Sequence, residues 1–215
     1  MALQQTDKID LVLFDVGGVI IDLFLDSARH ALLNQYRMPA SVYEEITRAT
    51  FERQPFSATE NATIGLITTD EYLEEFRRGC GGGVSVSTIK SNLESVIGPE
   101  RGEMVELIRT LSNRVRVAAF TNTIELHWNL LIDQNRFSFF GLVERVIASH
   151  ILGLAKPTPA AYRATSEILA VDAMNVLFID DSPRNVLAAR DFGMTSVRYT
   201  SYPELCETLR SLDLL

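Results

Sequence analysis

The sequence predicts an α/β fold, in which a doubly wound, Rossmann-like parallel sheet carries one inserted helical segment. Three observations support this prediction. Residues 9–14 form an apolar run that ends at Asp15. Residues 24–100 show mostly helical periodicity, and from residue 115 onward short apolar runs alternate with helical patterns. Such alternation is typical of βαβ units, which build a parallel sheet with right-handed crossovers.

The first apolar run, Ile-Asp-Leu-Val-Leu-Phe at 9–14, contains a single charged residue, Asp10. A run of this kind is typical of a strand that is buried on both faces of a parallel sheet. Asp15 follows at the carboxyl end, where open α/β sheets bind their ligands. Gly17 and Gly18 permit a sharp turn and bring backbone N–H groups close to an anion. A strand cap followed by an ordinary turn would explain the same residues.

The segment after the first strand contains four amphipathic patterns. We expect helices at 25–36, 42–51, 71–78 and 86–97. Gly98-Pro99 ends the last of them, and a further amphipathic helix is expected at 100–111. Because the helical block interrupts the strand–helix series, we expect residues 24–100 to form a cap domain over the carboxyl edge of the sheet. Residues 1–23 and 101–215 then form the α/β core domain.

The second half of the chain supplies the other strands of the sheet. We expect them at 115–120, 143–148, 176–179 and 195–199. A helix is expected at 124–133, and two more begin at Thr158-Pro159 and Ser182-Pro183, where a capping residue precedes a proline.

Size, charge and cysteine content limit the possible functions. The chain has 215 residues and a formal net charge of −8, which is unfavourable for general nucleic-acid binding. Cys80 and Cys206 lie far apart without metal-type spacing, so we expect no disulfide framework and a cytoplasmic protein. Residues 1–8 lack the apolar core of a signal peptide. Since no run reaches the ~18 apolar residues of a transmembrane helix, we expect no membrane partner.

Four polar features follow predicted strands or lie just beyond them: Asp15, Thr121-Asn122, Lys156 and Asp180-Asp181. Each alone has an ordinary explanation as a cap or a solvated surface residue. A doubly wound sheet brings such strand ends together, and three clustered carboxylates need a cation nearby. Oxygen ligands favour Mg²⁺, and the scattered histidines give no sign of a zinc site. A nucleophile, a metal and phosphate-binding groups are the requirements of phosphoryl transfer.

These segments resemble the four motifs of the haloacid dehalogenase (HAD) superfamily, over nearly the whole chain. The first to fourth motifs are matched in order by Phe14-Asp15-Val-Gly-Gly-Val, Thr121-Asn122, Lys156-Pro157 and Asp180-Asp181-Ser-Pro-Arg-Asn185. The helical segment lies between the first two motifs, as in members with a type 1 cap. Within this superfamily, the branch that includes α-D-glucose-1-phosphatase has two segments that this chain resembles. The similar segments here are Phe120-Thr-Asn-Thr-Ile-Glu-Leu-His127 and Leu152-Gly-Leu-Ala-Lys-Pro157.

The resemblance implies a Mg²⁺-dependent phosphatase that acts on a small phosphorylated metabolite, in particular a sugar phosphate such as a sugar 1-phosphate. Asp15 would be the nucleophile that forms an aspartyl-phosphate, and Lys156 would be the second catalytic residue. The implied phosphate-binding residues are Val16, Gly17, Thr121, Asn122 and Lys156. The implied metal ligands are Asp15, the Gly17 carbonyl and Asp181, with Asp180 in direct contact or behind the ligands, and Asn185 orienting a metal-bound water.

One position departs from the pattern of typical phosphatases in this superfamily, which carry an acid/base aspartate where this chain has Gly17. Loss of a positioned acid costs roughly 10²–10⁴ in rate. One hypothesis is a substrate whose leaving group needs little protonation, such as an anomeric sugar oxygen or an acyl phosphate. A second is a HAD-like binding protein without turnover. The third is a 2-haloacid dehalogenase, although such enzymes need no Mg²⁺ and usually have a serine–asparagine pair at the position of Asp180-Asp181.

Substrate selection is expected to depend on the cap, where the sequence gives only candidates. Side chains that either face the site or pack between cap helices are Tyr36, Tyr43, Phe51, Arg53, Phe56 and Tyr72. His127 is expected mainly as a structural residue near Trp128, with substrate contact as the alternative. The sequence gives no prediction of oligomeric state.

Overall fold

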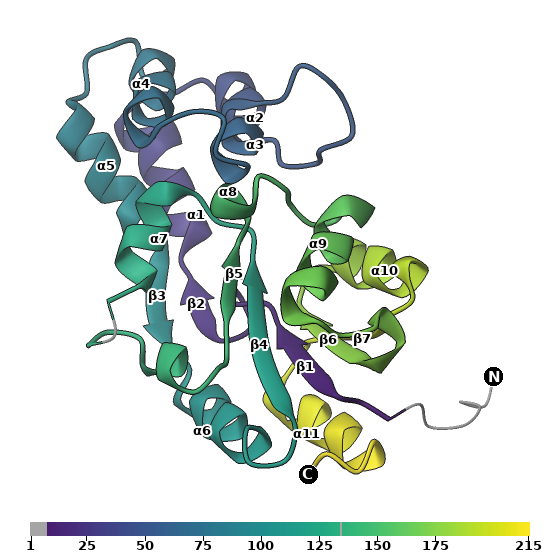
Figure 1. Cartoon of the computed structure of the whole chain (residues 1–215). Helices are drawn as coiled ribbons and strands as arrows, with labels where there is room; N and C mark the ends of the chain where they lie inside the picture. The colour runs from purple at the N-terminus through teal and green to yellow at the C-terminus, as the bar shows by residue number, and fades with distance from the viewer. Residues whose placement is uncertain (1–7, 134) are drawn as a thin grey trace.

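A computed structural model describes residues 8–133 and 135–215 of the chain (Figure 1). The prediction that residues 1–8 lack the apolar core of a signal peptide concerns mainly residues 1–7, which lie outside the described residues. Helices α2 to α5 gather at one end of the molecule, and a sheet with its flanking helices forms the other end. Within the described residues, no helix is both long enough and apolar enough to cross a membrane.

The central sheet has five parallel strands in the order β5-β4-β1-β6-β7, which confirms the predicted fold class. The strands are β1 (Leu11–Phe14), β4 (Arg116–Thr121), β5 (Val146–Ala148), β6 (Val176–Asp180) and β7 (Thr195–Arg198). All four residues of β1 are fully buried, as expected for the central strand of a sheet covered on both faces.

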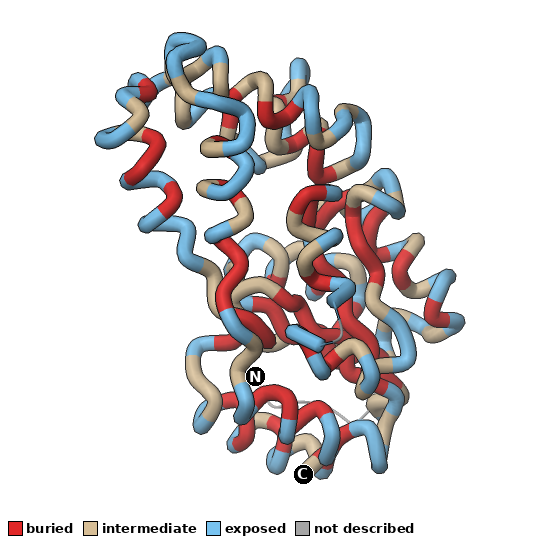
Figure 2. Tube along the Cα trace, turned by 90° about the vertical axis from the view of Figure 1, so that its left-hand side faces the viewer, coloured by how far each residue is buried: buried red, intermediate tan, exposed pale blue. Residues whose placement is uncertain are grey.

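The two faces of the sheet are covered by different helices, and alternate residues of β1 point to each. Val12 and Phe14 belong to a core that includes residues of α6 (Gly102–Leu111) and α11 (Tyr202–Ser211). Leu11 and Leu13 belong to the opposite core, with residues of α9 (Pro159–Leu169) and α10 (Pro183–Phe192). Figure 2 shows the resulting buried centre of this part of the molecule. Burial on both faces explains the continuous apolar sequence of this strand.

The inserted segment is helical and has a hydrophobic cluster of its own. Its helices are α1 (Leu25–His30), which continues as a π-helical turn at Ala31–Gln35, α2 (Ala40–Thr47), α3 (Ala58–Thr63), α4 (Thr69–Gly79) and α5 (Val86–Glu94). Capping boxes begin two of them, Ser57 with Glu60 at α3 and Thr68 with Glu71 at α4. Ile124 and Leu126, from the start of α7 (Glu125–Leu131), join the same cluster and attach it to the sheet.

Two predicted helices in this segment were too long. The helix expected at 42–51 ends at Thr47, because the buried carboxylate of Glu60 accepts the backbone N–H groups of Thr50 and Phe51 at 2.8 and 2.6 Å. These bonds hold Phe51 in the left-handed region at φ 56°, outside helical geometry.

The helix expected at 86–97 ends at Glu94, and residues after it form a strand. Here β3 (Ile97–Glu100) pairs antiparallel with β2 (Ile21–Leu23), so the expectation that Gly98-Pro99 ends a helix was wrong. A Cβ on Gly98 would lie only 2.7 Å from the Asp22 carbonyl oxygen, so glycine allows this close pairing.

Several elements had no sequence prediction, and others began later than expected. Helices α3 and α11 were not predicted. Helix α6 begins at Gly102 rather than at residue 100, and β5 begins at Val146 rather than at residue 143. The remaining short elements are α8 (Ser149–Leu152) and the 3₁₀ turns Ser138–Gly141 and Ala173–Asn175.

Candidate active site

Three neighbouring strands end at one edge of the sheet and place polar residues there. Asp15 follows β1, Thr121 ends β4 and Asp180 ends β6. Because β1 is hydrogen-bonded to both of the other strands in parallel register, these three residues lie side by side. The Asp15 backbone N–H donates to the Ile179 carbonyl at 2.8 Å, which fixes Asp15 next to Asp180.

Lys156 lies between the carboxylates of two of these residues. Its Nζ donates to Asp15 Oδ1 and to Asp180 Oδ2, both at 2.8 Å, and to the Phe120 carbonyl at 2.9 Å. An ammonium group has three N–H donors, so all are used. The side chain is 1% exposed, and its positive charge offsets the cost of burying two carboxylates.

Asp180 is fully buried and holds several groups of the site in place. Its Oδ1 accepts from the Ser182 backbone N–H at 2.8 Å, and Asn185 Nδ2 donates to both of its oxygens at 3.1 and 3.0 Å. Together with Lys156, these donors occupy the Asp180 carboxylate. Asn185, predicted to orient a metal-bound water, contacts Asp180 through these bonds.

Asp181 is the exposed member of a carboxylate cluster. One oxygen each of Asp15, Asp180 and Asp181 lie within 4.8 Å of one another, which is compatible with a shared metal ion. Gly18 has φ +77°, and a Cβ at this position would overlap the Asp181 carboxylate. The turn after Asp15 therefore requires glycine at position 18, for both its backbone and its space.

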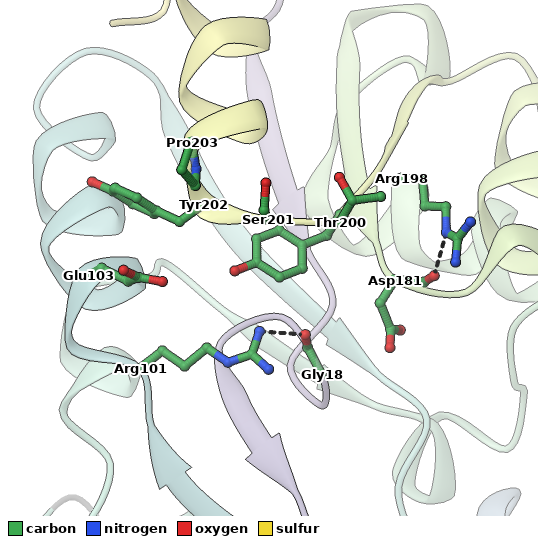
Figure 3. A pocket seen from close by; sticks show the side chains of 10 residues that line it. Gly18, Arg101, Glu103, Asp181, Arg198, Thr200, Ser201, Tyr202 and Pro203 are labelled. Carbon is green, nitrogen blue, oxygen red and sulfur yellow. Dashed lines mark hydrogen bonds between the residues drawn. The ribbon is translucent and has the colours of Figure 1, made fainter.

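Asp181 and Gly18 also line a pocket of about 700 Å³ (Figure 3). On its wall, Arg101 donates to the Gly18 carbonyl and to Asp22 Oδ1, both at 2.7 Å. Arg198 Nε donates to the Asp181 carbonyl at 3.2 Å. Arg101 thus fixes the loop after Asp15. The sequence reasoning missed this residue, because no local pattern shows that β3 returns the chain to this loop.

Thr121 and Asn122, both predicted to bind phosphate, differ in their surroundings. Thr121 is 4% exposed at the end of β4. Asn122 is exposed, and its side chain hydrogen-bonds to the backbone of Lys156. This contact positions the segment that carries Lys156, a role that the sequence did not predict.

The ionisation of the site follows from its burial. Desolvation and the nearby Asp180 raise the pKa of Asp15 to about 7, against the lowering effect of Lys156. Burial and Asp180 also raise the pKa of Asp181. Burial alone would lower the pKa of Lys156, but Asp15 and Asp180 raise it above its ordinary value. The site therefore has an excess of negative charge that a cation would stabilise.

A second cavity, of about 420 Å³, lies between the inserted helices and the start of α7, and it reaches Asn122 and Thr123. Of the predicted cap candidates, Tyr43 and Tyr72 line this cavity. Phe51 and Phe56 pack edge to face at 5.8 Å outside it. Tyr36 packs against the cluster of the inserted helices, and Arg53 is exposed in the loop before α3.

His127 lines the same cavity and connects the two parts of the chain. Its Nε2 lies 2.9 Å from the carbonyl of Leu93 in α5. Since a carbonyl only accepts, Nε2 carries the proton and donates. Burial lowers the pKa of His127, which keeps the ring neutral at neutral pH.

Comparison with known proteins identifies the relatives of this chain. Residues 9–193 match the sequence model of the haloacid dehalogenase-like hydrolases. Flavin mononucleotide hydrolase 1 of Arabidopsis thaliana is 30% identical over 112 residues, which are 52% of this chain and 44% of that protein. The match thus spans less than half of this relative. Phosphoglycolate phosphatase of Neisseria gonorrhoeae is 25% identical over 90% of this chain and 81% of its own length.

A solved structure shares the fold over almost the full length. It is a HAD family enzyme of Bacteroides thetaiotaomicron in complex with magnesium and inorganic phosphate. The two chains superpose with a TM-score of 0.78 at 23% identity, covering 92% of this chain and 98% of the other.

Proposed function

The chain belongs to the haloacid dehalogenase-like hydrolases, and we propose that it is a Mg²⁺-dependent phosphatase that cleaves a small phosphorylated metabolite through an aspartyl-phosphate. The observation that carries this proposal is the placement of Asp15 beside Lys156, Asp180 and Asp181 at the carboxyl edge of the sheet. The relative named as a phosphoglycolate phosphatase supports the same reaction class.

Asp15 is the proposed nucleophile. Its Oδ1 is held by Lys156, which leaves Oδ2 to attack phosphorus. The bond between phosphorus and the leaving oxygen breaks as the aspartyl-phosphate forms, and water later hydrolyses that intermediate. Lys156 neutralises negative charge next to the reacting atoms throughout. Substrate phosphate oxygens are proposed to contact the backbone at Val16 and Gly17, together with Thr121 and Asn122. Lys156 is proposed to bind a phosphate oxygen in exchange for one of its three present acceptors.

The residues of the site fit a magnesium ion. The cluster of three carboxylates offers the hard oxygen ligands that Mg²⁺ prefers, and a cation would offset the repulsion from Asp180 that, together with burial, raises the pKa values of Asp15 and Asp181. Asp15, Asp181 and the Gly17 carbonyl would hold it, with Asp180 and Asn185 behind them. When bound, the ion supplies neutralisation of the charge on the transferring phosphoryl group.

The leaving group must depart with little help from the protein, because Gly17 supplies no acid. A sugar 1-phosphate meets this requirement, as does an acyl phosphate. The type of leaving group is therefore the feature of the substrate that we propose this site constrains.

The test is phosphate release from acetyl phosphate and α-glucose 1-phosphate, beside glucose 6-phosphate, with Mg²⁺ and with EDTA. We expect metal-dependent release from the first two only, and no release by Asp15→Asn or Asp181→Asn. Asp172→Asn, which changes an exposed carboxylate outside the carboxylate cluster and outside both cavities described above, is the matched control. Equal turnover in Asp15→Asn would overturn the proposal, as would unchanged turnover in EDTA.

A further inference from the structure

We propose that the preferred substrates are aryl phosphates, in which the leaving group is a phenol carried on a flat, apolar ring system. This inference rests on the phosphatase function proposed above and narrows its substrate class. Two independent features carry it: the chemistry of the cavity that reaches Asn122, and the way in which the space beside Gly17 is filled.

The cavity between the inserted helices and α7 is mostly apolar. Its apolar lining side chains include Leu25, Leu32, Phe76, Leu93, Val96 and Ile124. At about 420 Å³ it falls within the range of small-molecule sites. Among the described residues that line it there is no carboxylate, and Arg29 is the single charged side chain. Because sugar hydroxyls need several hydrogen-bonding partners when buried, this lining favours an apolar ring over a sugar.

Several polar groups of this cavity already form hydrogen bonds within the protein. The Tyr72 hydroxyl lies 3.0 Å from Thr59 Oγ1, and the Thr47 hydroxyl donates to the Tyr43 carbonyl at 2.7 Å. The Arg29 guanidinium lies over the ring of Tyr43, 5.6 Å from its centroid. A flat aromatic ligand is compatible with such surroundings, since aromatic side chains prefer stacked or edge-to-face partners.

The same cavity contains no group suited to donate a proton to a leaving oxygen at neutral pH. Its titratable residues are Arg29, Tyr43, Tyr72 and His127. Arginine stays charged. Burial raises the pKa of Tyr43, and that of Tyr72 to about 12. The Nε2 proton of the neutral His127 ring is already donated to Leu93.

Leu23 lies beside the position of the missing acid. A Cβ on Gly17 would lie 2.9 Å from Leu23 Cδ1, so a side chain at position 17 requires the end of the Leu23 side chain of β2 to shift. The present packing of Leu23 therefore suits glycine at position 17.

Leaving-group acidity then decides which esters react. Phenols ionise near pH 10, like the tyrosine side chain, whereas an alcohol is a far weaker acid, similar to water. When Asp15 attacks, the bond from phosphorus to the aryl oxygen breaks and its electron pair stays on that oxygen. The phenolate departs without a proton and takes one later from water. An alkoxide would have to leave as a far stronger base.

The experiment compares kcat/KM for phenyl phosphate and benzyl phosphate in Mg²⁺, a pair with the same ring but different leaving groups. We expect at least a 100-fold preference for phenyl phosphate, the lower end of the contribution of a general acid. 2-Naphthyl phosphate should exceed α-glucose 1-phosphate, and Ala49→Trp, which narrows the cavity, should raise KM for 2-naphthyl phosphate more than for acetyl phosphate.

The double variant Gly17→Asp with Leu23→Ala tests the missing acid directly. It should increase turnover of benzyl phosphate relative to phenyl phosphate, with Leu23→Ala alone as its control. Equal turnover of phenyl and benzyl phosphate by the unmodified enzyme would overturn the inference, as would a higher kcat/KM for α-glucose 1-phosphate than for 2-naphthyl phosphate. In either case the phosphatase function would stand. Absence of phosphate release from every substrate, acetyl phosphate included, would instead overturn the proposed function itself.

Discussion

The side chain of Asn122 pairs with the backbone of Lys156. Asn122 Nδ2 donates to the Lys156 carbonyl at 2.7 Å, and the Lys156 backbone N–H donates to Asn122 Oδ1 at 2.9 Å. This double contact joins the end of β4 to the segment before α9. It therefore sets the point from which the Lys156 side chain extends to Asp15 and Asp180.

Asn122→Ala should remove both hydrogen bonds and leave the Lys156 backbone groups without these partners. We expect the free energy of unfolding to fall by about 1–3 kcal/mol, and turnover to fall because Lys156 is less well placed. Urea denaturation and phosphate release from acetyl phosphate measure the two effects. Asn113→Ala, which removes an exposed bond to the Arg109 carbonyl, is the control. Unchanged stability and turnover in Asn122→Ala would contradict this role.

Lys156→Met should be strongly destabilising, because it leaves Asp15 and Asp180 without their positive partner. Breaking a buried pair in this way costs about 3–5 kcal/mol. The loss should be smaller at pH 5 than at pH 8, since protonation of a carboxylate removes one of the unpaired charges. Urea denaturation at both values of pH tests this. The exposed Lys90→Met should change stability little, and a similarly small effect for Lys156→Met would show that the buried pair contributes nothing.

The sheet and its site were predictable because both depend on local sequence. A strand buried on two faces reads as a continuous apolar run, and the polar residue after it marks the functional edge of the sheet. This is why β1 and the cluster of Asp15, Lys156 and Asp180 could be anticipated. The same reasoning could not give the contacts inside the cluster, since which oxygen Lys156 bonds depends on side-chain geometry.

The inserted segment was harder to predict because distant contacts override its local pattern. Strand β3 contains Gly98 and Pro99, which locally favour a helix end, and only its pairing with β2 makes it a strand. In the same way, residues 48–51 continue an amphipathic pattern but are not helical, because the Glu60 carboxylate accepts hydrogen bonds from the backbone of Thr50 and Phe51. Neither partner is visible from the local sequence.

His127 should reduce the stability of the folded state as the pH falls below about 6.5. Burial lowers its pKa in the folded state, so the unfolded chain binds the proton first and acid favours unfolding. The raised pKa of Asp15 acts in the opposite direction, so the contribution of His127 is measured as the difference between the unmodified protein and His127→Gln. Urea denaturation at pH 7.5 and 5.5 measures the loss. His127→Gln, which keeps a donor for the Leu93 carbonyl, should lose less stability over this interval. Some dependence of stability on pH should remain in His127→Gln, because burial also lowers the pKa of His150. His30→Gln, at an exposed position, is the control, and an equal loss in His127→Gln would refute the assignment.

Glu60 should control the order of the loop at 48–57. Its carboxylate is fully buried and accepts the backbone N–H groups of Thr50, Phe51 and Ser57, as well as a bond from Arg48. From the same loop, the Thr50 carbonyl and the Glu52 carboxylate accept from Arg184 of α10, at 3.0 and 2.9 Å.

Glu60→Ala leaves these buried donors without an acceptor, so we expect the loop to open while the sheet stays folded. Trypsin cleaves after arginine, and Arg53 lies exposed within this loop. Cleavage after Arg53 should therefore become at least several-fold faster in Glu60→Ala, under conditions where the α/β part resists digestion, because local opening exposes the backbone. Glu75→Ala, which removes only a surface ion pair with Arg78, should be cleaved at the rate of the unmodified protein. Equal rates of cleavage after Arg53 in all three proteins would show that Glu60 does not hold this loop.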